Sequence, residues 1–188
     1  MNEKQPYVSV LPMVRYLLVM MICLGHVACG YHFYSVKESL PGGVKRVSIA
    51  TFKNDTNEAG IENTFTSALR NEFFKSKVIK IVDSQKAEAE IIGRVKQISI
   101  DPTAQSEKQI SSRGTKILAL EYNVNVSVDV SLIRRQDQKV LWARTVSDYR
   151  RYSAGENLLQ NETKQREAFE KIAVYVMEQA HDMMFENF

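Results

Sequence analysis

Alternating apolar and polar side chains between residues 118 and 132 form the clearest pattern in the chain. Every second residue from Leu118 to Leu132 is apolar or aromatic, and most of those between them are polar. A period of two predicts a long antiparallel strand with one solvated face. A turn at residues 135–138 and a further strand at 140–149 should complete a hairpin.

Three shorter runs predict strands earlier in the chain. Residues 44–52 and 78–82 are rich in β-branched side chains and are bounded by turn-forming residues. The run at 89–100 changes its apolar phase near Lys96, which predicts a β-bulge. Residues 101–115 are polar and contain proline and glycine, so we expect a long loop there.

Two segments have the periodicity of amphipathic helices. Apolar residues recur at helical spacing in the first, at Ile61, Phe65, Ala68, Leu69 and Phe73. The second repeats at Ala168, Ile172, Tyr175, Val176, Gln179 and Met183. It could start at Asn161, or earlier through a capping box at residues 153–156. The order of elements predicts an α+β fold, with two helices packed on one face of a four- to five-stranded, mostly antiparallel sheet.

The first 28 residues read as a targeting segment. Arg15 precedes an apolar run at residues 16–25, which is too short to span a bilayer as a helix. Ala28 directly before Cys29 resembles a bacterial lipoprotein processing site, although His26 stands where an aliphatic residue is usual. An ordinary secreted protein is the alternative, and Met1 and Met13 both remain possible starts.

We therefore expect three parts: a signal peptide at 1–28, a lipidated tether at 29–43 and a single domain at 44–188. Lipid on Cys29 would anchor the mature chain to a membrane. Apart from that covalent acyl group, the sequence suggests no cofactor.

Composition excludes several classes of function. The 188 residues include 25 Lys and Arg against 22 Asp and Glu, and a formal charge of +3 is too small to indicate a nucleic-acid partner. Both cysteines lie within the first thirty residues, so no disulfide framework or cysteine zinc site is expected. No motif of a hydrolase, phosphate-binding loop or metalloprotease is present, and we expect neither catalytic residues nor a metal site.

Basic residues near the predicted loops are the remaining candidates for binding. Arginine's planar guanidinium suits phosphate and carboxylate groups, and lysine supplies a point charge. Such residues also keep strands soluble and protect their edges. As a set they could receive an anionic lipid head group, and the candidates are Arg113, Lys116, Arg134, Arg135 and Lys139.

Several short motifs, taken in order, resemble the lipopolysaccharide-assembly lipoprotein family LptE. They are Cys29-Gly-Tyr-His-Phe33, Leu40-Pro41, Val47-Ser-Ile-x-x-Phe-x-Asn54-x-Thr56, Gly60-Ile-Glu62, Ala87-Glu-Ala-Glu-Ile-Ile-Gly93, the strand at 122–130 and Lys139-Val-Leu-Trp142. The resemblance implies a lipoprotein on the periplasmic side of the outer membrane that plugs the β-barrel LptD. Together the two proteins would insert lipopolysaccharide into the outer leaflet, without catalysis.

A rival interpretation rests on the first half of the chain. Its order of strand, helix and strand also resembles periplasmic modules of secretion-pore lipoproteins and of lipoproteins that activate cell-wall synthases. Self-assembly into a ring would distinguish a pore subunit from a plug that pairs with one barrel.

Overall fold

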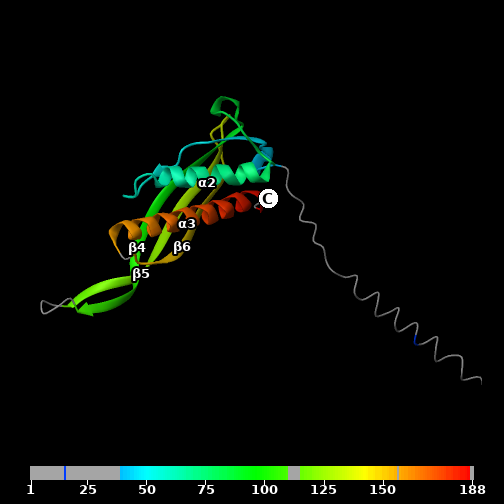
Figure 1. Ribbon diagram of the computed structural model, residues 1–188. Coiled ribbons are helices and arrows are strands. Elements are labelled where there is room, and N and C mark those ends of the chain that lie inside the picture. The colour runs from blue at the N-terminus through cyan, green and yellow to red at the C-terminus, as the bar shows by residue number, and fades with distance from the viewer. Residues whose placement is uncertain (1–14, 16–38, 110–114, 156, 187–188) are drawn as a thin grey trace, which may run out of the picture. The chain divides into compact units, whose positions relative to one another are not determined.

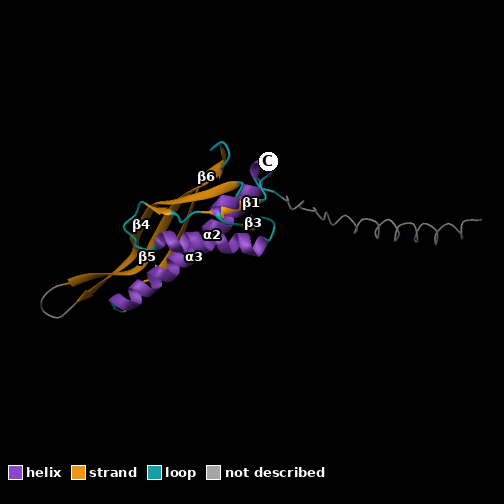
Figure 2. Cartoon of the chain, turned by 90° about the horizontal axis from the view of Figure 1, so that it is seen from above, coloured by secondary structure: helices purple, strands orange, loops and turns teal. Residues whose placement is uncertain are grey.

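The computed structural model describes residues 15, 39–109, 115–155 and 157–186, and all but the first belong to one compact unit. Two helices lie side by side on one face of a sheet (Figure 1, Figure 2). The helices are α2 (Ile61–Ser76) and α3 (Leu158–Glu186), and two short 3-10 turns are η2 (Pro41–Gly43) and η3 (Ser84–Lys86). The strands are β1 (Arg46–Ile49), β2 (Lys53–Asn54), β3 (Lys80–Ile81), β4 (Ala89–Gln109), β5 (Thr115–Arg134) and β6 (Val140–Ser153).

The predicted α+β class is confirmed, but the sheet is mixed rather than mostly antiparallel. Its order is β3-β1-β4-β5-β6, with β2 beside β4. β4, β5 and β6 pair antiparallel, whereas β1 pairs parallel with both β3 and β4. The chain leaves β1 through α2 before it returns as β3, and a crossover of that kind places two strands parallel.

The apolar phase of β5 faces the helices, as its alternation predicts. Its inward residues, each no more than 2% exposed, are Val124, Val126, Val128, Val130 and Leu132. All five apolar positions of the first predicted helix are buried on α2. The core is therefore the layer between the sheet and the helix pair.

The bulge near Lys96 is confirmed by a register shift between Val95 and Gln97 in the pairing of β4 with β5. The predicted loop at 101–115 is wrong, because β4 continues to Gln109 and β5 begins at Thr115. Pro102 lies next to another register shift, and proline is tolerated at such irregularities. The two long strands form a hairpin arm that extends past the helices (Figure 1).

The start of α3 differs from both predicted positions. Asn157 caps the helix, since its Oδ1 accepts a hydrogen bond from the Gln160 N–H at 2.9 Å. Asn161 lies inside the first turn, where its Oδ1 accepts from the Gly155 N–H at 3.2 Å. Asparagine occurs at both positions, so residue type alone could not distinguish the cap.

Candidate functional site

The structure divides the predicted cationic residues between the two ends of β5. Arg134, Arg135 and Lys139 lie at the β5–β6 turn, while Lys116 lies near the opposite end, paired in register with Lys108 of β4. Lys116 and Arg134 are 18 positions apart along the strand, which is roughly 60 Å. Arg113 lies outside the described residues. The candidates therefore cannot act as one cluster.

Hydrogen bonds hold the β5–β6 turn in one shape. The Arg134 N–H donates to the Lys139 carbonyl at 2.8 Å, and the Arg134 guanidinium pairs with Asp137 at 3.2 Å. Gln138 has a left-handed backbone (φ 56°), and its side-chain amide donates to the Arg135 carbonyl at 3.0 Å. The three basic side chains are thus presented from an ordered turn.

This turn is tied to the segment just before β4. The Arg135 N–H donates to the Glu88 carbonyl at 3.0 Å, and the Arg135 guanidinium donates to Ser84 Oγ in η3. Lys86, at the end of η3, is exposed. Two segments about fifty residues apart in the chain therefore present cations side by side.

Glu88 connects the same region to the start of β1. Its carboxylate accepts from the backbone N–H groups of Lys45 and Arg46, at 2.8 and 3.2 Å, and from Arg46 Nε at 3.0 Å. The hydrogen bond from the Lys45 N–H is the main reason that the pKa of Glu88 is lowered. Lys80 is joined to this edge through its N–H, which donates to the Lys45 carbonyl at 3.0 Å.

We name the resulting surface the basic end, made of residues 45–46, 80–88 and 134–139. It carries seven basic side chains against three acidic ones, Asp83, Glu88 and Asp137, a formal excess of four positive charges. Sequence reasoning missed part of it, since three separate segments contribute. The missed members are Lys45, Arg46, Lys80 and Lys86.

Two neighbouring arginines of β6, Arg150 and Arg151, are not part of this surface. The Arg150 guanidinium lies 6.0 Å from the centre of the Tyr175 ring of α3 and 4.0 Å from the Asp148 carboxylate. Such contacts hold an arginine against its own domain. Arg151 pairs in register with Asn123 farther along the sheet.

The face of the sheet opposite the helices is polar, as the alternation of β5 predicts. Its side chains bond across the strands: Asn125 donates to Ser99 Oγ at 3.2 Å, and Thr145 donates to Asp129 at 2.6 Å. Lys96 pairs with the Asp129 carboxylate at 3.4 Å. The surface suits water or a polar partner rather than lipid.

The part of the chain that the structure describes contains no group of three or more His, Cys, Asp or Glu side chains able to hold a metal ion. None of its helices has the length and apolarity needed to cross a membrane. The predicted lipidation site, Cys29, lies outside the described residues. Binding through the basic end and the polar face is what this geometry offers.

Several solved structures are similar to this chain at low sequence identity. A Xanthomonas campestris protein of family DUF330 has a TM-score of 0.54 and 12% identity, covering 78% of this chain and 86% of its own. The rare lipoprotein B of Shewanella oneidensis has a TM-score of 0.44 and 14% identity, covering 74% and 92%. A PelC dodecamer from Paraburkholderia phytofirmans has a TM-score of 0.48 and 13% identity, covering 80% of this chain and 95% of its own. The first shows a common fold alone, and the other two support no further conclusion.

No curated protein sequence matches the chain. The family model described as LptE, lipopolysaccharide-assembly, matches residues 44–185, which is nearly the whole of the compact unit. The chain therefore belongs to the LptE family of lipopolysaccharide-assembly proteins.

Proposed function

We propose that this protein is lipid-anchored through Cys29 on the periplasmic side of the outer membrane and occupies the lumen of an LptD-like β-barrel. There it would help to assemble the barrel and to insert lipopolysaccharide into the outer leaflet. Membership of the LptE family carries this proposal. The protein would act by binding and would transform no substrate.

The polar face of the sheet supports a position inside a barrel. The lumen of a large outer-membrane barrel is polar and hydrated. Asn125, Ser127 and Asp129 expose hydrogen-bonding groups along one face of β5, while the alternating apolar side chains at 124–132 are buried on the helix side. A domain of this kind can lie in a wet lumen without exposing its core.

The basic end supports contact with the anionic groups of lipopolysaccharide. Arg135 and Lys86 are held on adjacent turns by the bonds to Ser84 and Glu88, so their charges are positioned before a ligand arrives. Charge-assisted bonds to phosphate are among the stronger polar contacts in proteins. Exposed charges are also screened by salt, so this binding should weaken as ionic strength rises.

Charge reversal at the two ends of the sheet tests this assignment. K86E/K139E at the basic end should weaken lipopolysaccharide binding about tenfold or more at low salt. At high salt the affinities of this variant and the parent chain should lie closer together. R134E/R135E should also weaken binding. The matched control, K108E/K116E, makes the same change of net charge at the far end of β5 and should have little effect. If all three variants lost the same affinity for lipopolysaccharide, only the net charge would matter, and the basic end would not be the binding site.

A further inference from the structure

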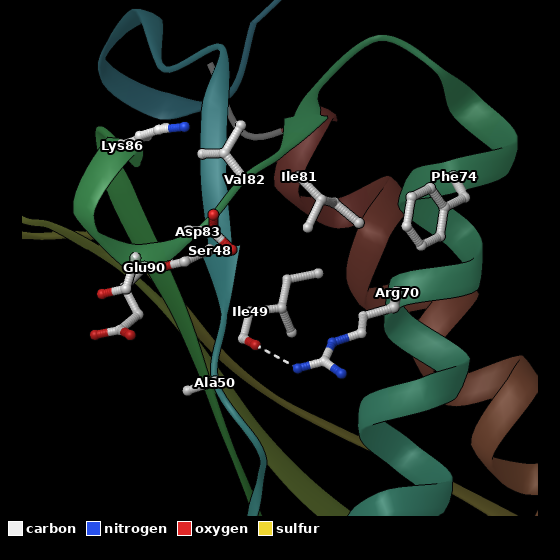
Figure 3. A pocket seen from close by; sticks show the side chains of 11 residues that line it. Ser48, Ile49, Ala50, Arg70, Phe74, Ile81, Val82, Asp83, Lys86 and Glu90 are labelled. Carbon is white, nitrogen blue, oxygen red and sulfur yellow. Dashed lines mark hydrogen bonds between the residues drawn. The ribbon is translucent and has the colours of Figure 1, made fainter.

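A groove of about 700 Å³ lies along the outer edge of β1, beside α2 (Figure 3). Side chains from both faces of the sheet line it. Ile49, Ile81, Phe74 and Arg70 border it on the helix side, and Ser48 and Glu90, which pair in register, border it on the other. A groove bordered by both faces lies in the plane of the sheet, where a further strand would run.

The groove exists because β3 is shorter than β1. β3 pairs only with Arg46 and Val47, whereas β1 continues to Ile49. The bond from the Val82 N–H to the Val47 carbonyl, at 2.9 Å, lies at the end of this pairing. Within the described residues, no strand pairs with the outer edge of Ser48 and Ile49.

Arg70 of α2 covers the exposed backbone at this point. Its Nη2 donates to the Ile49 carbonyl at 2.8 Å, in the place of a strand N–H. Natural proteins commonly protect free sheet edges with charged side chains. Because the Arg70 side chain is exposed, it can swing away when another donor reaches the carbonyl.

Two further features suggest that the groove receives a ligand. Ser48 is only 6% exposed, yet its Oγ has no hydrogen-bond partner among the described residues. A buried hydroxyl without a partner is unfavourable unless something else supplies one. Phe74 is 63% exposed at the rim of the groove, so its ring offers an apolar surface to whatever enters.

We propose that an extended peptide segment of a protein partner adds to β1 in this groove, continuing the line of β3. A main-chain N–H of the segment would replace Arg70 at the Ile49 carbonyl. Side chains of an added strand alternate between the two faces. One apolar side chain would lie between Ile81 and Phe74, and an acidic side chain two residues away would meet the released Arg70 guanidinium. The intervening residue, small and polar, would face Ser48.

This inference does not depend on the proposed role in lipopolysaccharide assembly. Heptapeptides displayed on phage can be selected on residues 29–188, immobilised through Cys29, the one cysteine of that segment. Selected peptides should contain an apolar and an acidic residue two positions apart. Each is then synthesised with single N-methyl groups along the backbone. Methylation of the N–H that faces the Ile49 carbonyl should weaken binding about tenfold, while methylation of its neighbours should have little effect.

Variants of the groove show whether the peptides bind there. R70E and Phe74→Ser should each lower affinity tenfold or more. The matched controls, R151E on the polar face and Leu159→Ser in the exposed first turn of α3, should leave the affinity unchanged. The proposal is overturned if no selected peptide needs the groove, or if N-methylation at every position has the same effect. A third outcome would also overturn it: dodecyl phosphate displaces the peptides, and their binding does not depend on any one backbone N–H. The groove would then be a site for amphiphiles.

Discussion

Gly93 of β4 occupies a position where a methyl group has no space. A Cβ built on Gly93 would lie 2.3 Å from three carbon atoms of the Phe52 ring. Ordinary contacts between carbon atoms are about 3.5–4.0 Å. The Phe52 side chain is 3% exposed, and its N–H donates to Thr66 Oγ at 3.0 Å, so both ring and main chain are held in place. Gly93→Ala therefore forces the ring to move.

The cost follows from the two ways in which the ring can respond. Shifting within the core is overpacking, which costs about 1–3 kcal/mol, and leaving the core forfeits about 1.5–3 kcal/mol of burial. Replacing glycine by alanine also restricts the unfolded chain, and this stabilises the folded state by about 0.4–1 kcal/mol. We expect a net loss of about 1–2.5 kcal/mol. At about 2–4 °C per kcal/mol for a domain of this size, Tm should fall by about 2–10 °C.

Urea denaturation followed by circular dichroism measures this loss, and a double-mutant cycle with Phe52→Leu tests its cause. The smaller side chain leaves room for the new methyl group, so Gly93→Ala should cost at least about 1 kcal/mol less in the Phe52→Leu background. Additive losses would show that the ring is not the obstacle. An unchanged stability of Gly93→Ala alone would refute the close packing of the Phe52 ring on Gly93.

Three further predictions concern a helix cap, a carboxylate and the anchor. Asn157→Ala should destabilise the protein by about 1 kcal/mol, measured by urea denaturation, because the first turn of α3 loses its acceptor; Asn157→Asp, which keeps an acceptor, should retain most of the stability. The lowered pKa of Glu88 stabilises the fold above the usual carboxyl range of about 4 to 4.5, and this contribution disappears as the pH falls through the folded-state value. E88Q should therefore show a shallower loss of Tm on acidification than the parent chain, and parallel curves would contradict the assignment. Cys29→Ala should leave the protein in the soluble periplasmic fraction, whereas continued membrane fractionation would argue that residues 16–25 remain as an anchor.

Local patterns predicted the parts of the fold that depend on one buried face. The period of two in β5 and the helical spacing of α2 each reflect a single apolar side, and both elements pack on that side in the structure. The bulge at Lys96 was also predictable, since an extra residue shifts the apolar phase. The extension of β4 over residues 101–109 was not predictable, because pairing with β5 through main-chain groups demands no apolar pattern.

Only part of the basic end could be predicted from the sequence. Arg134, Arg135 and Lys139 are close in the chain and were found from their charge. Lys45 and Lys86 join them only because β1, η3 and the β5–β6 turn meet at one end of the sheet. The parallel pairing of β1 with two neighbours depends on the same long-range arrangement, and no local pattern encodes it.

The composition of the complex extracted from membranes tests the central claim most directly. The acylated chain, purified in mild detergent through a C-terminal tag, can be weighed by native mass spectrometry together with whatever it retains. We predict one copy of this chain bound to one copy of a large outer-membrane β-barrel. A homo-oligomeric ring without any barrel would contradict the account and favour a secretion-pore subunit.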